Sequence, residues 1–440
     1  MQYLNVIYDW VSGAPLVVLL VGTGLFLTVR LRFIQVTALF HALRLAFSSE
    51  DKESEGDISH FKALMTALAA TIGTGNIAGV ATAIVAGGPG ALFWMWVTAA
   101  VGMATKYSEA ILAVRYRVVD EKGEMCGGPM YALERGLGQK WLGTLFAVFG
   151  AVAAFGIGNM VQSHSVADAL HESLSIPYLA TGLVLAVLTA AVVLGGIKRI
   201  GEVSAYLVPV MAAIYVIGAL VILILNYAKL PEAFRLIFYH AFNPTAATGG
   251  FAGAVVKETI RWGIRRGLFS NESGLGSAPI AAAAAKTKNP KRQALVSMTG
   301  TFLDTIVVCS MTGLVIICMD LWDSGVNGAP LTVASFRAGL YGAMGDLVVS
   351  VGLVLFAFST ILGWAYYGEK CIEYLFGVGI VFPYRLLWVV VVLAGGSFGK
   401  IDFVWTFADI MNALMAFPNL ICLLLLSGVI VAETRRWRED

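Results

Sequence analysis

The chain has 440 residues, of which 58% are hydrophobic and 13% are charged, and its formal net charge is +2. Soluble domains average about 25% charged residues, and nucleic-acid binding needs a clustered positive excess, so both classes are excluded. Apolar stretches that can cross a hydrocarbon core of roughly 30 Å recur along the chain. The sequence therefore predicts an all-α polytopic membrane protein.

About eleven transmembrane helices are predicted, with boundaries that follow the apolar stretches. In chain order they are 14–32, 62–87, 90–116, 141–170, 177–195, 203–227, 249–286, 291–318, 345–375, 381–399 and 401–431. Lys and Arg concentrate after the odd-numbered spans, as with Arg30 after the first and Arg115 and Arg117 after the third. By the positive-inside rule, the N-terminus is predicted outside and the C-terminus in the cytoplasm, in the cell inner (plasma) membrane.

The second predicted span is interrupted by polar and flexible residues. It contains "TIGTGNIAG", residues 71–79, in which glycines alternate with Thr74 and Asn76. The spacing does not fit a dinucleotide-binding fingerprint, which also needs a preceding strand. Close helix packing explains Gly79, but it does not explain Thr74 and Asn76 beside two further glycines. We therefore expect the helix to be unwound here.

The seventh predicted span has the same feature. Residues 269–279 read "FSNESGLGSAP" before the sequence becomes apolar again. This span lies five spans after the first interrupted one, so the two cross the membrane in opposite senses. Matching interruptions in two inverted halves indicate the binding site of a secondary transporter. We predict one transmembrane domain over 1–440, with an extra helix at 14–32 and inverted repeats at 62–227 and 249–431.

An unwound segment inside a membrane has a specific chemistry. Irregular backbone is tolerated there only where it is buried in protein or lines a cavity. Its free N–H groups attract an anionic group and its free C=O groups attract a cation. The two interruptions therefore predict a site for one substrate carboxylate and one Na⁺.

Several motifs resemble one transporter family. "GGPGALFWMWVTAAVG", residues 87–102, closely resembles the signature of the sodium:alanine symporters, the alanine or glycine:cation symporter family. "GTGNIAG", "MATKYSEA", "GGPMYAL", "RGLFSNESGLGSAP" and "GWAYYGEK" also resemble it, in the expected order over essentially the whole chain. The resemblance implies a LeuT-like 5+5 inverted repeat with one extra N-terminal helix. It also implies import of alanine or glycine with Na⁺ by alternating access, without an organic cofactor.

The resemblance also implies which residues contact the substrate. They come from the two interruptions (core helices 1 and 6), from "GIGNMVQ" in core helix 3 and from "GWAYYGEK" in core helix 8. The predicted substrate-binding residues are Thr74, Gly75, Gln162, Phe269, Ser270, Asn271, Gly274 and Trp364.

A more distant resemblance to LeuT places the cations. One Na⁺ site is implied by carbonyl groups of Ala69, Ile72 and Phe356 with the hydroxyl groups of Ser359 and Thr360. Hard oxygen ligands suit such a cation. The alternative is that both hydroxyls bond back to carbonyls one turn earlier in their own helix.

A second Na⁺ site is implied by Asn76, Ser270 and Asp304. Asp304 departs from the LeuT pattern, in which an amide is expected.

Other charged residues within the spans have more than one interpretation. Lys106 and Glu109 lie three residues apart on one helix face, so an ion pair is expected, either structural or as a gate. Glu272 is expected to be a local cap or gate, because a carboxylate would repel the substrate's carboxylate. A polar face that includes Arg266 is expected to line an extracellular vestibule, and Asp409 to face the core.

Three alternatives to the Na⁺-coupled transporter remain open on the sequence. They are an H⁺-coupled amino acid symporter, an intramembrane enzyme and a channel. No zinc-protease, serine-hydrolase or Walker motif is present, so an enzyme is not expected. Saturable flux that stops without Na⁺ favours the transporter, whereas product formation favours the enzyme.

Overall fold

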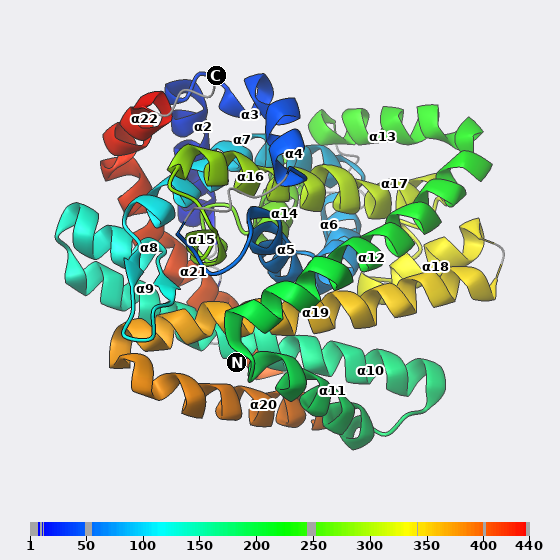
Figure 1. Ribbon diagram of the computed structural model, residues 1–440. Helices are drawn as coiled ribbons and strands as arrows, with labels where there is room; N and C mark the ends of the chain where they lie inside the picture. The colour runs from blue at the N-terminus through cyan, green and yellow to red at the C-terminus, as the bar shows by residue number, and fades with distance from the viewer. Residues whose placement is uncertain are drawn as a thin grey trace.

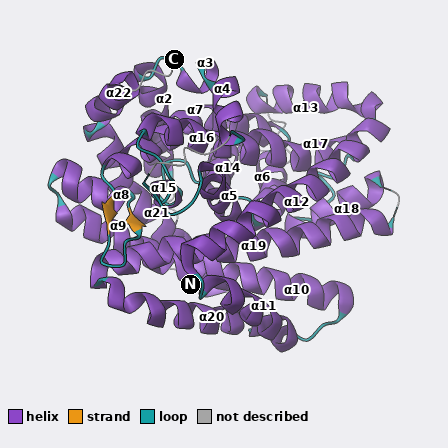
Figure 2. Ribbon diagram, in the orientation of Figure 1, coloured by secondary structure: helices purple, strands orange, loops and turns teal. Residues whose placement is uncertain are grey.

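The computed structural model describes residues 8, 11, 13–48, 55–243, 252–340, 342–398 and 402–436. Nearly all of this part is helical, as Figure 2 shows. Its one sheet pairs the antiparallel strands β1 (Val118–Val119) and β2 (Met125–Cys126). The prediction of an all-α protein is therefore confirmed, apart from this short hairpin.

Figure 1 labels most of the helices along the chain. The first half contains α2 (Ala14–Arg30), α3 (Ile34–Thr37), α4 (Leu39–Ala46), α5 (His60–Thr71), α6 (Val80–Gly87), α7 (Gly90–Arg115), α8 (Pro129–Tyr131), α9 (Lys140–Ala153), α10 (Val161–Leu174), α11 (Tyr178–Val193) and α12 (Gly196–Leu225). The second half contains α13 (Leu230–Phe242), α14 (Ala252–Asn271), α15 (Pro279–Ala283), α16 (Pro290–Thr301), α17 (Ser310–Cys318), α18 (Gly328–Gly339), α19 (Ala343–Phe376), α20 (Val381–Ser397), α21 (Asp402–Leu425) and α22 (Ser427–Arg436).

π-Helical turns interrupt several of these helices, and such turns are frequent at functional sites. They span Gly75–Gly79, Ala132–Gly136, Ala154–Met160 and Phe302–Cys309. Two 3₁₀ turns, Tyr227–Lys229 and Val378–Ile380, precede α13 and α20. The first π-helical turn lies within the predicted interruption of the second span.

Six helices in the described part are long and apolar enough to cross a membrane. The bent pair formed by α5 and residues 75–87 adds a seventh if it is counted as one span. α2 and α11 are apolar but shorter, with 17 and 16 residues. The number of eleven therefore stays a prediction. Residues 249–251 and 399–401, at predicted span ends, lie outside the described residues.

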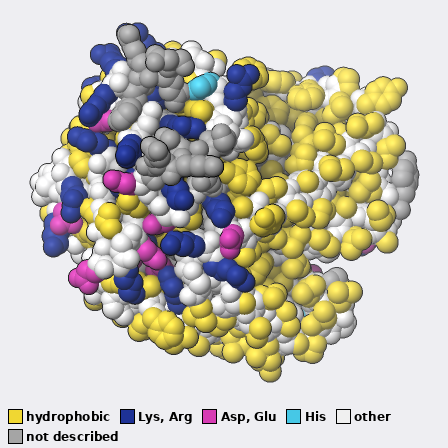
Figure 3. Space-filling model, viewed as in Figure 1, with side chains coloured by type: hydrophobic (Ala, Val, Ile, Leu, Met, Phe, Trp, Pro, Cys, Tyr) yellow, Lys and Arg dark blue, Asp and Glu magenta, His cyan; other side chains and the backbone are white. Residues whose placement is uncertain are grey.

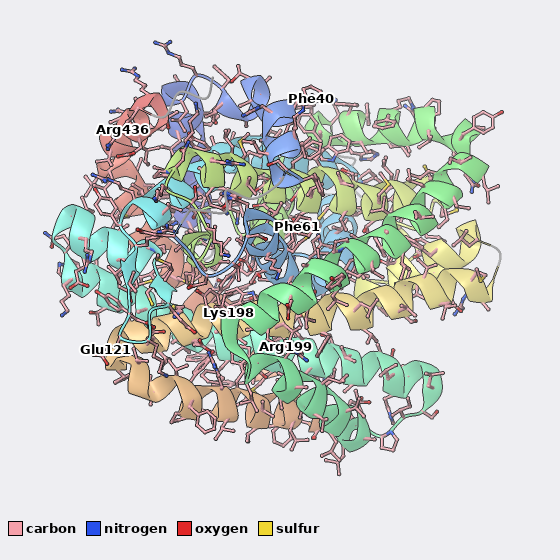
Figure 4. The ribbon with its side chains drawn as sticks, in the orientation of Figure 1. Phe40, Phe61, Glu121, Lys198, Arg199 and Arg436 are labelled. Atoms are coloured by element: carbon pink, nitrogen blue, oxygen red, sulfur yellow. The ribbon has the colours of Figure 1, made fainter. Side chains whose placement is uncertain are left out.

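Two helix ends differ from the bounds predicted for the spans. The sixth span was expected to begin at residue 203, but α12 begins at Gly196 and includes Lys198 and Arg199, which Figure 4 labels near the start of that helix. Long basic side chains can keep their charge in water while their stems follow an apolar helix, so a helix end tolerates them. The last span was expected to reach residue 431, but α21 ends at Leu425 and α22 follows.

The surface divides into a charged part and an apolar part. In Figure 3, Lys and Arg gather on the left of the view, where Figure 1 places α8, α9 and α22, and hydrophobic side chains cover the right, over α12, α13 and α18. Large apolar side chains on α11 and α12 are more than half exposed, among them Val187 and Ile224 at 67% each. Exposed apolar area of this extent fits contact with lipid. The orientation of the termini stays a prediction.

The interrupted helices lie in the interior, between elements from both halves of the chain. α5 packs against α12 and α19, and α6 packs against α7 and α14. Ala69, Ile77 and Val80 are fully buried there. The region of the predicted binding site is therefore surrounded by protein, as unwound backbone in a membrane requires.

Arg117 connects the two interrupted helices at one end through hydrogen bonds. Its guanidinium donates hydrogen bonds to four carbonyl oxygens, at distances of 2.6 to 3.0 Å. Those carbonyls belong to Glu55, Ala283, Ala285 and Thr287. They lie just before α5 and at or after the end of α15, so one planar cation with several donors connects two segments that are distant in sequence.

We predict that Arg117→Ala lowers the stability of the purified protein by about 2 kcal/mol or more, because several charge-assisted hydrogen bonds are lost together. The melting temperature in detergent should fall by about 2 °C or more. Arg115→Ala is the matched control, since Arg115 forms a partly exposed ion pair with Glu433 at 3.2 Å. Such pairs contribute about 1 kcal/mol at most. Equal melting temperatures for the two variants would contradict this role of Arg117.

Candidate functional site

The first interruption separates α5 from the π-helical turn and α6. α5 ends at Thr71, Ile72 is extended with φ −77° and ψ 92°, and the two helical halves are bent by 54°. The Asn76 side chain stabilises the bend, because its Oδ1 accepts a hydrogen bond from Gly73 N at 2.9 Å. A Cβ atom on Gly73 would lie 2.6 Å from Thr360 Oγ1. A glycine is therefore required for this backbone to approach α19.

The second interruption covers residues 272–278, between α14 and α15. Glu272, Gly274 and Gly276 have φ angles of 55°, 93° and 86°, in the left-handed region that glycine tolerates best. Glu109 Oε1 accepts hydrogen bonds from the backbone N–H groups of Gly274 and Gly276 at 3.0 and 3.1 Å. It also accepts one from Asn419 Nδ2 at 2.7 Å. A buried carboxylate thus satisfies the unwound backbone.

The expected ion pair between Lys106 and Glu109 is wrong. Among the described residues, no ion pair within 4.0 Å joins them. Lys106 is 4% exposed, and its Nζ has no hydrogen-bond partner there. Neutral donors occupy Glu109 Oε1 instead. The prediction failed because a spacing of three residues brings two side chains to one helix face but does not fix where their charged ends point.

A cavity of about 290 Å³ lies where the two interruptions meet. Six of the eight predicted substrate-binding residues line it: Thr74, Gly75, Gln162, Phe269, Ser270 and Trp364. Gly75 faces the end of α14, just before the second interruption, because a Cβ atom placed on it would lie 3.9 Å from Ser270 Cα. Gln162 Oε1 is buried without a hydrogen-bond partner in the described part of the chain. The cavity therefore offers backbone from both interruptions and one free amide oxygen.

Asn271 and Gly274 are not among the described residues that line this cavity. Asn271 Nδ2 donates to Thr305 Oγ1 at 3.1 Å, and its Oδ1 accepts from Ser273 N at 3.0 Å. A Cβ atom on Gly274 would lie 2.4 Å from Leu20 Cδ2. Both residues hold the shape of the interruption instead, because an unwound segment turns successive residues in different directions.

A cluster of oxygen atoms connects α5 to α19, at the five residues predicted for a Na⁺ site. Ser359 Oγ lies 3.1 Å from the carbonyl oxygen of Ala69, 3.5 Å from that of Ile72 and 2.8 Å from that of Phe356. Thr360 Oγ1 lies 2.9 Å from the Phe356 carbonyl oxygen. Both hydroxyls thus bond back within α19, as the alternative predicts, and Ser359 also meets carbonyls across the gap to α5.

A second oxygen cluster surrounds Asp304, which is fully buried. Its carboxylate accepts hydrogen bonds from Asn76 Nδ2 at 2.7 Å, from Ser270 Oγ at 2.9 Å and from Thr305 Oγ1 at 2.8 Å. The structure therefore brings together the three residues predicted for a second cation site, and it adds Thr305. Among the described residues, Asp304 forms no ion pair within 4.0 Å.

Charged residues also line the cavity. They are Arg266, Glu272 and Asp409, and the aromatic Trp405 lines it as well. The expectation that Arg266 lines an extracellular vestibule stays a prediction. Glu272 was expected to be a cap or gate away from the substrate, and Trp405 was not predicted as a site residue. In the sequence, Glu272 stands in an interrupted segment and Trp405 in the last predicted span. Neither position tells whether the side chain points into the cavity.

The chain matches known proteins over its whole length. The profile of the sodium:alanine symporter family matches residues 1–440. The sodium/alanine symporter AgcS of Methanococcus maripaludis is 58% identical over 445 residues, which cover 99% of this chain and 97% of that protein. The probable sodium/glutamine symporter GlnT of Bacillus subtilis is 38% identical over 435 residues, which cover 98% and 89%.

Solved structures of other transporters share the fold. The manganese transporter of Eremococcus coleocola, in complex with an aromatic bis-isothiourea substituted compound, has a TM-score of 0.54 at 10% identity, over 88% of this chain and 97% of that one. MhsT in complex with L-phenylalanine has a TM-score of 0.51 at 13% identity, over 87% and 93%. At these identities the likeness shows the LeuT-like fold alone. By the full-length profile match and the 58% identical relative, the chain belongs to the sodium:alanine symporter family.

Proposed function

We propose that the protein is a secondary active transporter that imports a small neutral amino acid, alanine or glycine, together with Na⁺ by alternating access. The observation that carries this proposal is the cavity of about 290 Å³ where the two interruptions meet. Two oxygen clusters accompany it, one at Ser359 and Ala69 and one at Asp304 and Asn76. The name of the relative AgcS, a sodium/alanine symporter, supports the same substrate and ion.

The substrate would bind as a zwitterion between the interruptions. Its carboxylate would meet backbone N–H groups near Thr74 and Gly75, where the first helix is unwound. Its ammonium would meet Gln162 Oε1 and carbonyl groups near Ser270. The unpartnered Gln162 oxygen supports this assignment, because a buried acceptor without a donor is costly unless a ligand supplies one.

One Na⁺ would bind to oxygen atoms of Ala69, Ile72, Phe356, Ser359 and Thr360. On binding, it would replace the hydrogen bonds that Ser359 and Thr360 now donate to carbonyl groups, and it would hold α5 against α19. Because the same interruption provides part of the substrate cavity, the ion and the amino acid would bind cooperatively. Each would raise the affinity of the other by the same factor.

A second Na⁺ would bind at Asn76, Ser270 and Asp304. The fully buried Asp304 carboxylate, with neutral partners only among the described residues, supports a cation at this position. The same carboxylate also suits a proton, so an H⁺-coupled symporter is the second candidate. Eleven spans, the two inverted repeats, an outside N-terminus and a cytoplasmic C-terminus complete the proposal.

Uptake into proteoliposomes tests this function. Purified protein should mediate counterflow of radiolabelled alanine or glycine that saturates and stops when choline replaces Na⁺. Uptake that persists without Na⁺ but follows an imposed pH gradient would instead identify the H⁺-coupled symporter. Flux that does not saturate would favour a channel, and conversion of the amino acid would favour an enzyme.

We predict that Trp364 limits the size of the substrate. Trp364 is 1% exposed and lines the cavity, and Gly158 lies so close that a Cβ atom there would be 2.1 Å from Trp364 Cβ. Trp364→Phe should strengthen inhibition of alanine uptake by valine about tenfold, because removing bulk admits the larger side chain. Trp388→Phe, at another fully buried tryptophan outside the cavity, is the control. An unchanged substrate range in folded Trp364→Phe would exclude Trp364 as the wall.

We predict that Thr360 takes part in Na⁺ coupling. Thr360→Ala should raise the Na⁺ concentration for half-maximal uptake about tenfold, which corresponds to a loss of about 1.4 kcal/mol of ion binding. Substrate affinity should recover at saturating Na⁺. Thr66→Ala is the control, because Thr66 is also fully buried and also donates to a carbonyl one turn earlier, at 2.8 Å from Lys62 O. If both variants titrate with Na⁺ as the wild type does, Thr360 serves its helix alone.

A further inference from the structure

We propose that the carboxylate of Glu272 binds the ammonium group of the amino acid and is therefore the anionic recognition group of the cavity. The inference rests on the proposed function and names a contact that the function by itself does not assign. It also revises the expectation that Glu272 avoids the substrate. That expectation rested on the substrate's carboxylate alone. The zwitterion also carries an ammonium group on the same α-carbon, and this group attracts a carboxylate.

The position of Glu272 in the second interruption is the first observation. Its φ angle of 55° is one that residues other than glycine seldom adopt, and its neighbours Gly274 and Gly276 share the left-handed region. The side chain lines the cavity together with Phe269 and Ser270. An acidic residue in a conformation that glycine would adopt more easily suggests that its carboxylate is needed there.

The second observation is that its carboxylate has few partners. Glu272 Oε2 accepts a hydrogen bond from Ser277 Oγ at 2.6 Å. Among the described residues, Glu272 forms no ion pair within 4.0 Å. Its side chain is nevertheless buried, with a residue exposure of 4%. A buried carboxylate with so little compensation is stabilised when a cation binds beside it.

The nearby charged side chains do not neutralise the Glu272 carboxylate. Lys106 is the cation that interacts with Glu272 at longer range, and it interacts with Glu109 and Asp304 as well. One ammonium group therefore serves three buried carboxylates. Glu109 Oε1 accepts hydrogen bonds from two backbone N–H groups and from Asn419, while its Oε2 has no hydrogen-bond partner among the described residues. Asp304 accepts hydrogen bonds from three neutral donors. Glu272 accepts one close hydrogen bond, from the Ser277 hydroxyl, and the Trp364 side chain also interacts with its carboxylate. Of the three it is the carboxylate that lines the cavity.

Asp409 is the other acidic residue that lines the cavity, but its surroundings differ. It accepts a hydrogen bond from Tyr8 Oη at 3.2 Å, and both Arg265 and Arg266 interact with its charge. Two arginines thus offset one carboxylate at that end. Glu272 directly follows α14 and is two residues from Ser270, whose Cα would be 3.9 Å from a Cβ on Gly75, so it is adjacent to the expected substrate position.

The arrangement gives the zwitterion a fixed direction. Its carboxylate meets backbone N–H groups of the first interruption, and its ammonium meets the Glu272 carboxylate and Gln162 Oε1 at the second. A charge-assisted hydrogen bond is roughly twice as strong as a neutral one. The contact recognises the α-amino group itself, so it distinguishes an amino acid from the hydroxy acid of the same size.

The experiment measures binding by isothermal titration calorimetry at saturating Na⁺ for the wild type, Glu272→Gln, Glu272→Asp and Glu109→Gln. Glu272→Gln should weaken alanine binding about tenfold or more, as expected for losing a charge-assisted hydrogen bond. Glu272→Asp keeps the charge and should recover part of the affinity. Competition by L-lactate, which lacks the ammonium group, should change much less, so the preference for alanine over lactate should fall.

Glu109→Gln is the matched control, because Glu109 is a buried carboxylate that supports the same interruption without lining the cavity. It should lower the ligand-free melting temperature without selectively lowering the preference for alanine. Alanine affinity in Glu272→Gln within threefold of the wild type would overturn the inference, as would an equal loss of alanine and lactate binding. If Glu272→Gln fails to fold, the test uses Glu272→Asp, whose side chain is shorter by one methylene group. Alanine affinity equal to the wild type in Glu272→Asp would then overturn the inference. A wild-type protein that binds neither alanine nor glycine would refute the proposed function itself.

Discussion

The interior of this protein depends on the need to satisfy unwound backbone inside a membrane. Each free N–H or C=O group buried there without a partner costs about 1–3 kcal/mol, and two interruptions expose several such groups at once. Asn76 Oδ1 serves the N–H of Gly73, and Glu109 Oε1 serves those of Gly274 and Gly276. Polar side chains of the chain itself therefore hold both segments in their unwound form.

The same constraint explains why ion and substrate sites share elements. The segment that ends α5 contributes Ala69 and Ile72 carbonyls to the cluster with Ser359, and Thr74 and Gly75 to the cavity a few residues later. A change in the bend of 54° between the helical halves would alter both sets of groups. The proposed coupling between ion and substrate therefore requires no long pathway, since one bent segment contributes groups to both sites.

The buried interior holds more carboxylates than cations around Lys106. Glu109, Glu272 and Asp304 are buried around Lys106, and none of them forms a close ion pair with it in the described part of the chain. The three carboxylates differ in their partners: backbone and Asn419 for Glu109, neutral side chains for Asp304, and the Ser277 hydroxyl with the nearby Trp364 side chain for Glu272. The fold role of Glu109 and the proposed cation and ligand roles of Asp304 and Glu272 thus follow from how much of each charge the protein compensates.

The sequence by itself determined the class of protein, the two interruptions and the family, because apolar length, glycine placement and motif order are local properties. It also placed the oxygen cluster of Ala69, Ile72 and Ser359, since the resemblance assigns these by position in motifs. Only the tertiary structure decided that Glu109 meets the Gly274 amide from 165 residues away, and that Asn271 turns from the cavity while Glu272 faces it. An unwound segment has no periodicity, so the direction of each side chain follows from its distant partners and not from its spacing.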